Sequence, residues 1–137
     1  MFKNKYSIKI IVLVLFFLII GKLTNAADLE ISSNRNGQYN LTGSDNLTLN
    51  SGVTLTNNSS NSAREGIRLN SGSGNTINLN GNIATQYNNS DAVQIVNSDS
   101  VTINQNGNIT YNTVGGGSCC QRAFDINNST NVTINSA

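Results

Sequence analysis

A four-residue phrase recurs along the chain: an apolar residue, a polar residue, a second apolar residue and then asparagine. It occurs at Leu47–Asn50, Ile67–Asn70, Ile77–Asn80, Val101–Asn104, Phe124–Asn127 and Val132–Asn135. Side chains alternate between the two faces of a strand, so each phrase predicts a short strand with two side chains inward and one outward. Asparagine tolerates left-handed backbone angles, so we expect a corner after each strand. Such repeats predict a chain that winds on itself.

The spacing of the phrases predicts three strands in each winding. First strands are expected to begin at residues 39, 67, 93 and 124, which gives steps of 28, 26 and 31 residues. One coil of a three-sided parallel β-helix has this length. We therefore predict an all-β fold, a right-handed parallel β-helix (a solenoid) of about three and a half coils of three short strands, because stacked coils bury the apolar face that one coil leaves open.

Stacking of coils predicts columns of side chains. We expect one inward column on the second strands to contain Leu47, Ile77, Val101 and Val132. The asparagines that follow the first two strands of each coil are expected to form ladders, each amide bonding the next coil. Outward threonines at Thr48, Thr102 and Thr133 form a further column. That column suggests an ice-binding face, although Asn78 interrupts it.

The start of the chain has the composition of a secretory signal peptide. Lysines are followed by an unbroken apolar run, Ile10–Ile20, and by small residues up to Ala26. This order predicts a helical signal, residues 1–26, that is cleaved after Ala26. The apolar run is shorter than the ~20 residues of a membrane-spanning helix. We interpret residues 27–38 as a lead-in or cap and residues 39–137 as the β-helix, truncated at its C-terminal end.

Cleavage would reverse the sign of the net charge. All the lysines lie in the predicted signal, so four arginines and seven acids remain and the net charge is −3. No basic cluster is left to bind phosphates, and we therefore expect no nucleic-acid partner.

The residue types for catalysis are scarce. The chain has no histidine, the commonest general base and metal ligand. Glycoside hydrolysis needs two carboxyl groups about 5–9.5 Å apart, and the outward positions of the predicted strands bring no two acids together. Asp91 and Asp99 are expected in corners, where aspartate is common. The sequence thus predicts no catalytic residue, no cofactor and no metal site.

The corners are unequal in length. Second and third strands are joined by short, glycine-marked gaps, whereas the third strand reaches the next first strand through residues 56–66, 86–92 and 112–123. Variable loops on a fixed scaffold often carry partner contacts. The candidate contact residues in these loops are Arg64, Glu65, Asp91 and Arg122.

Cys119 and Cys120 are adjacent in the longest of these loops. Neighbouring Cα atoms are ~3.8 Å apart, below the usual range for a disulfide, so a vicinal bridge would be strained. Three interpretations stay open: a vicinal disulfide, two free thiols, or a cross-link to another molecule.

Several stretches resemble the passenger domains of bacterial autotransporters: NTINLNGNI at 75–83, DAVQIVNSDSVTINQNGNI at 91–109 and AFDINNSTNVTIN at 123–135. The resemblance implies export by the signal-peptide machinery of a Gram-negative bacterium, followed by display at the outer membrane or release outside the cell. It also implies adhesion to a host cell-surface protein or glycan. The family carries a C-terminal translocator barrel that this chain lacks, which suggests the N-terminal part of a longer protein.

Two functions follow as expectations. The first is a non-catalytic, exported β-helix fragment that acts in adhesion or host contact. The alternative is the N-terminal part of a β-helix polysaccharide lyase or hydrolase whose active site lies in further coils.

Overall fold

The computed structural model describes residues 26–59, 65–86, 89–111 and 121–137. The predicted signal peptide up to residue 25 lies outside these ranges, as do Arg64, Cys119 and Cys120. The described residues contain strands and no helix. None of them belongs to a helix of the length and hydropathy needed to cross a membrane.

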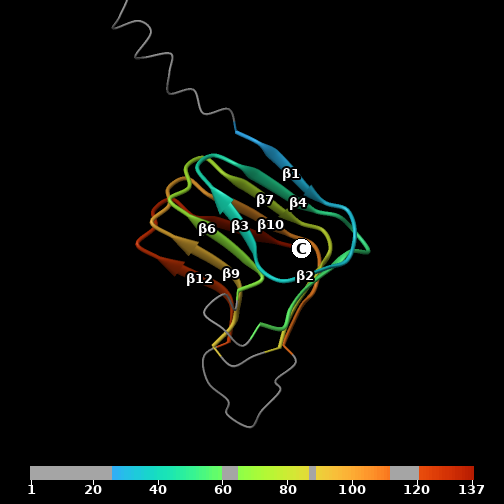
Figure 1. Cartoon of the computed structure of the whole chain (residues 1–137). Coiled ribbons are helices and arrows are strands. Elements are labelled where there is room, and N and C mark those ends of the chain that lie inside the picture. The colour runs from blue at the N-terminus through green and yellow to red at the C-terminus, as the bar shows by residue number, and fades with distance from the viewer. Residues whose placement is uncertain (1–25, 60–64, 87–88, 112–120) are drawn as a thin grey trace, which may run out of the picture.

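In the described ranges, thirteen strands form three sheets, and the chain visits the sheets in strict rotation (Figure 1). The strands are β1 (Asp28–Ile31), β2 (Arg35–Asn36), β3 (Tyr39–Thr42), β4 (Asn46–Leu49), β5 (Thr54–Asn57), β6 (Ile67–Asn70), β7 (Thr76–Leu79), β8 (Asn82–Thr85), β9 (Asp91–Val96), β10 (Thr102–Gln105), β11 (Ile109–Tyr111), β12 (Arg122–Asn127) and β13 (Thr133–Ser136). Sheet A has the order β1-β4-β7-β10-β13, sheet B β2-β5-β8-β11, and sheet C β3-β6-β9-β12.

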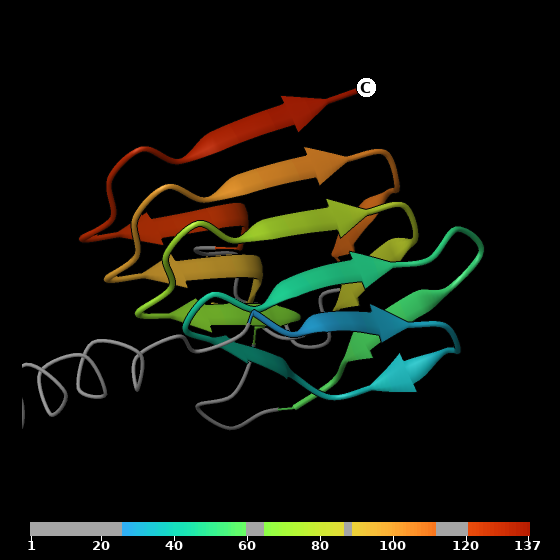
Figure 2. The same ribbon diagram turned by 90° about the horizontal axis from the view of Figure 1, so that it is seen from above.

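Every strand pairs in parallel with the strand three places away in the chain. Figure 2 shows the result for sheet A, in which β1, β4, β7, β10 and β13 lie one above another. The predicted all-β class with stacked parallel strands is confirmed, and the arrangement is consistent with a β-helix-like solenoid. The predicted lead-in, residues 27–38, contains β1 and β2, which pair with β4 and β5.

Aliphatic side chains fill the space between the three sheets. The inward positions alternate with outward positions along the strands, and most of the outward positions are polar, as the phrase requires. The fully buried members, each exposed by 1% or less, include Leu47, Leu49, Leu55, Ile67, Leu69, Ile77, Leu79, Ile83, Val93, Ile95, Val101 and Ile103. Burial of each such side chain contributes about 1.5–3 kcal/mol, so this column of aliphatic residues is the main source of stability.

The register confirms the prediction in sheet C and corrects it in sheet A. In sheet C, Tyr39, Ile67, Val93 and Phe124 align as predicted. In sheet A, Leu47 and Ile77 align with Ile103 and Ile134. Val101 and Val132 instead lie one residue before β10 and β13. A shift of two residues keeps every side chain on its face, so alternation alone could not distinguish the two registers.

Left-handed residues do occur at the corner from sheet C to sheet A, one place later than predicted. The equivalent residues Ser71, Asn97 and Asn128 have φ of 57°, 51° and 48°. The next residue of each corner bonds to its equivalent in the following repeat. The backbone N–H of Gly72 donates to the hydroxyl oxygen of Ser98 at 3.0 Å, and the N–H of Ser98 donates to the hydroxyl oxygen of Ser129 at 3.0 Å. Stacked side-chain bonds therefore hold this corner in the same conformation in successive repeats.

Thr85 offers a test of the core. It is 0% exposed, and its hydroxyl oxygen has no hydrogen-bond partner among the described residues. A buried hydroxyl without a partner costs about 1 kcal/mol or more. We therefore expect Thr85→Val to stabilise the chain by about 1 kcal/mol in urea unfolding. Thr56→Val, on the outward side of β5, is the control and should change stability by less than about 0.5 kcal/mol. A Thr85→Val variant less stable than the control would show that the hydroxyl is bonded.

Candidate functional site

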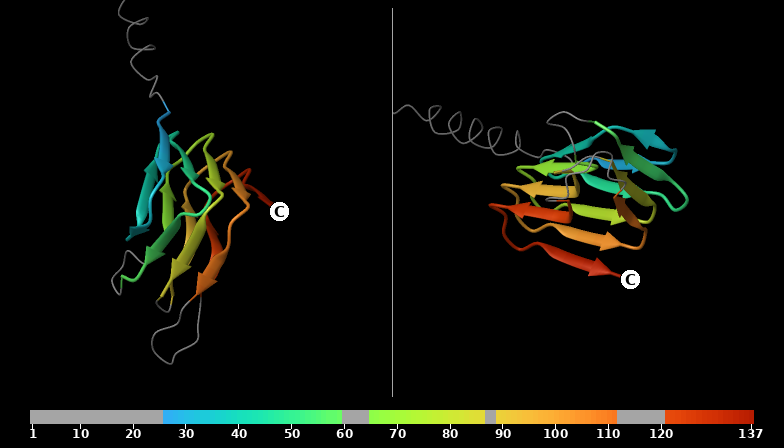
Figure 3. Two further views of the ribbon diagram at one scale, coloured as in Figure 1. Left: turned by 90° about the vertical axis from the view of Figure 1, so that its right-hand side faces the viewer. Right: turned by 90° about the horizontal axis from the view of Figure 1, so that it is seen from below.

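The corner from sheet B to sheet C gathers the long connections of the chain. β5, β8 and β11 end on the same side of the molecule (Figure 3). Their last residues align, Asn57 with Thr85 and Thr85 with Tyr111. Where the chain re-enters sheet C, Arg122 aligns with Asp91. The described ends of these connections therefore stack in register along one edge.

An ion-pair cluster lies at this edge. The Nε atom of Arg122 is 3.1 Å from Oδ1 of Asp91, and its Nη2 donates to Oδ2 of the same carboxylate at 3.4 Å. Its Nη1 is 2.9 Å from Oδ1 of Asp125. The side chains of Asp91 and Asp125 are 4% and 5% exposed, whereas that of Arg122 is 55% exposed. One arginine thus joins two buried carboxylates and keeps its outer side toward solvent.

Both carboxylates accept further hydrogen bonds besides those in the ion pairs. Oδ2 of Asp125 accepts bonds from Nε2 of Gln94 at 3.1 Å and from Nδ2 of Asn127 at 2.7 Å. Oδ1 of Asp91 accepts the backbone N–H of Arg122 at 3.2 Å. Bonds of this kind satisfy buried charges, so the cluster ties β9 to β12.

Burial dominates the electrostatics of the corner. It raises the pKa of Asp91, while the hydrogen bond and charge of Arg122 oppose the rise and the charge of Asp125 adds to it. Burial and the negative charge of Asp91 together raise the pKa of Tyr111 to about 12. The Tyr111 hydroxyl is buried, with no hydrogen-bond partner among the described residues. Tyr111 therefore stays protonated at neutral pH.

The expectation that outward positions bring no two acids together did not consider Asp91, which Arg122 joins to Asp125. Asp91 is the first residue of β9 and not part of a corner, and Arg122 is the first residue of β12. Asp91 lies on the inward side of β9, two residues before Val93, so a comparison of outward positions leaves it out. The arginine side chain is long enough to contact the inward-side Asp91 on the next strand and the outward Asp125 three residues along its own strand. Asp99, by contrast, lies in a corner as expected, where bonds from Thr130, Ser100 and Asn131 lower its pKa.

The predicted contact residues have different environments. Glu65 is 8% exposed and accepts a hydrogen bond from Nε2 of Gln38. Asp91 is 3% exposed. Arg122 is the most exposed of the described candidates. Within the described ranges, no group of three or more acidic, cysteine or histidine side chains is arranged to hold a metal ion.

A second polar surface covers sheet A, and its composition differs from the prediction. Thr76, Thr102 and Thr133 align in one outward column without interruption. Beside it, Asn135 donates to Asn104 at 2.9 Å and Asn104 donates to Asn78 at 2.8 Å. The predicted column through Thr48 is therefore wrong by two residues, for the same reason as the inward column. The related octapeptides 76–83 and 102–109, TINLNGNI and TINQNGNI, held the signal for the correct register.

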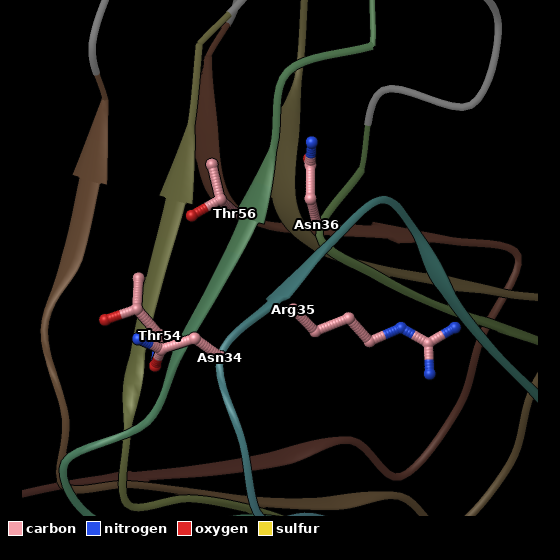
Figure 4. A pocket seen from close by; sticks show the side chains of 5 residues that line it. All are labelled: Asn34, Arg35, Asn36, Thr54 and Thr56. Atoms are coloured by element: carbon pink, nitrogen blue, oxygen red, sulfur yellow. The ribbon is translucent and has the colours of Figure 1, made fainter.

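A third polar surface lies on sheet B near the start of the described chain. Asn34, Arg35, Asn36, Thr54 and Thr56 line a recess there (Figure 4). Arg35 points away from Thr54 and Asn34, and its guanidinium carbon lies 4.8 Å from the centre of the Tyr39 ring. The arginine is therefore engaged by a cation–π contact and is not directed into the recess.

The fold and the sites together define a three-sheet parallel β protein with polar outer surfaces. Comparison of the chain with protein-family models, with curated proteins and with solved structures gave no match.

Proposed function

We propose that the chain is an exported, non-catalytic right-handed parallel β-helix, similar to an autotransporter passenger, that acts in adhesion or host contact. The predicted signal supports passage through the export machinery of a Gram-negative cell, followed by display at the outer membrane or release. A host surface protein or glycan is the expected partner. The rotation of the chain through three parallel sheets supports the solenoid.

One observation carries the proposal: the described ends of the long connections from sheet B to sheet C align at one edge. Asn57, Thr85 and Tyr111 align at their starts, and Asp91 and Arg122 align at their ends. The ion pairs of Arg122 tie β9 to β12 at that edge. Adhesive surfaces are commonly built from variable loops on such a scaffold.

The test is binding of the chain to cultured host cells and to immobilised matrix proteins and glycans. Residues 60–63 and 112–118 are each replaced by Gly-Ser of equal length, so that Glu65 and Arg122 remain. We expect binding to weaken by at least about tenfold, the loss of one or two good contacts. Matching circular dichroism spectra serve as the folding control. Equal binding by the double-loop variant would contradict the proposal.

A polysaccharide lyase or hydrolase is the second candidate function, because one arginine joins two carboxylates. These carboxylates are almost fully buried, and their oxygens accept bonds from neighbouring side chains. Such engagement favours a structural role for them. Release of reducing or unsaturated sugar ends from polygalacturonate or a neutral glucan, abolished in Asp91→Asn but present in Asp99→Asn, would support the enzyme.

A further inference from the structure

A shallow groove runs across the outer side of sheet A toward the last strand. It is lined by Asn78, Asn104, Asn106, Asn135, Ser136 and Ala137. Two rows of asparagine bound it. The first contains Asn78, Asn104 and Asn135, and the second contains Asn80 and Asn106. We call this surface the amide groove.

Hydrogen bonds between repeats fix the amides in both rows. Asn135 donates to Asn104 and Asn104 to Asn78, and in the second row Asn106 donates to Asn80 at 2.8 Å. An asparagine amide has two N–H donors and an oxygen with two lone pairs. Each amide in the two rows therefore keeps at least one donor and one acceptor site after its ladder bonds. A ligand meets these groups already oriented, which lowers the entropic cost of binding.

The surroundings of the groove are uncharged. The outward residues of β7, β10 and β13 are threonine and asparagine, and none of these three strands contains an acid, a base or an aromatic residue. Thr76, Thr102 and Thr133 add a parallel column of hydroxyl groups. The acids of sheet A, Asp28 and Glu30, lie on β1 at the other end of the sheet. A charged ligand would find no oppositely charged side chain on these three strands.

We propose that the amide groove binds an extended, uncharged polysaccharide laid across the strands. The inference rests on the proposed function and names the ligand class of one of its surfaces. Neighbouring strands repeat at ~4.8 Å, a spacing comparable to the length of one sugar residue in an extended chain. Vicinal hydroxyl groups both donate and accept, as the free positions of the amides do. Because no aromatic ring stacks on the sugar, each unit binds weakly and affinity comes from many units at once.

The experiment is affinity electrophoresis of the full chain through gels containing dextran, mannan or mixed-linkage β-glucan, with alginate as the anionic comparator. We expect at least one neutral polymer to retard the chain, alginate to leave it unaffected, and glucose or mannose to compete poorly. Asn104→Thr removes the central amide while keeping a residue that fits this column, since Thr48 occupies it on β4. Retardation should weaken by about tenfold in that variant.

Asn82→Thr on β8 is the matched control, because Thr54 occupies the same column on β5 and sheet B lies away from the groove. It should migrate as the unaltered chain does. The proposal is wrong if no neutral polymer retards the chain, if Asn104→Thr is retarded equally, or if alginate binds better. Incorporation of the chain into growing ice, without binding to any polymer, would also overturn the proposal. The threonine and asparagine columns would then be an ice-binding surface. If the chain bound host cells but no neutral polymer, the ligand proposed for the amide groove would be wrong and the proposed adhesive function would stand.

Discussion

Replacing Gly107 by alanine should destabilise the chain by about 3 kcal/mol or more, since a forced backbone shift in a packed region is among the costliest effects of one methyl group. A Cβ atom at Gly107 would lie 1.7 Å from the carbonyl oxygen of Gly81 in the preceding repeat. This carbonyl oxygen belongs to the backbone, so no side-chain rotation can relieve the clash. The Asn-Gly-Asn corners must therefore separate, and β10 and β11 would lose pairing with β7 and β8. The measurement is the urea midpoint followed by circular dichroism.

Gly52 provides the matched control, because it lies in the equivalent glycine-marked corner for a different reason. Its φ is +77°, and nothing lies within 4 Å of a Cβ built there. Gly52→Ala should cost only about 1 kcal/mol of backbone strain. If the two variants lost equal stability, the close stacking of the Gly81 and Gly107 corners would be refuted.

Arg122→Met should destabilise the chain by about 2–3 kcal/mol at neutral pH. Removing one partner of a buried ion pair leaves its charge uncompensated, and here two nearly buried carboxylates, Asp91 and Asp125, lose the same cation. Solvent around the half-exposed arginine reduces the effect relative to a fully buried pair. Methionine keeps most of the apolar stem, so the loss reports mainly on charge. Urea unfolding measures it.

The loss of unfolding free energy in Arg122→Met should depend on pH. Burial already raises the pKa of Asp91, and Arg122 is what opposes the rise. Without the arginine the pKa of Asp91 rises further above its unfolded value. The native state then holds more protons than the unfolded state over a wider range, so its stability falls as pH rises through that range. We expect a small deficit near about pH 4 and a large one near about pH 7.

Arg68→Met is the control for this series. Arg68 is an outward residue of β6 and forms no ion pair with another described residue. It should change stability by less than about 0.5 kcal/mol at either pH. A deficit in Arg122→Met that was the same at both pH values would show that the arginine acts through packing rather than charge.

The alternation of apolar and polar residues was enough to place the strands from β3 onward and their faces, but not β1 and β2, which lie in the predicted lead-in. Ile67, Leu69, Ile77 and Leu79 are buried because a strand directs every second side chain to one side. Length and composition of the gaps likewise indicated which corners are short and which connections are long. These are local properties, and a chain with a period of two residues displays them without reference to distant neighbours.

The tertiary structure decided which repeat positions meet. Alternation has the same period in both registers of sheet A, so it does not select the register that aligns Ile77 with Ile103. The related octapeptides 76–83 and 102–109 indicate that register, and the stacked corners at Gly81 and Gly107 show how it packs. Arg122 and Asp91 are 31 residues apart in the sequence, and their contact depends on the pairing of β9 with β12. The ion-pair cluster and the amide groove arise from this long-range pairing, because charges and amides interact through space whatever their order along the chain.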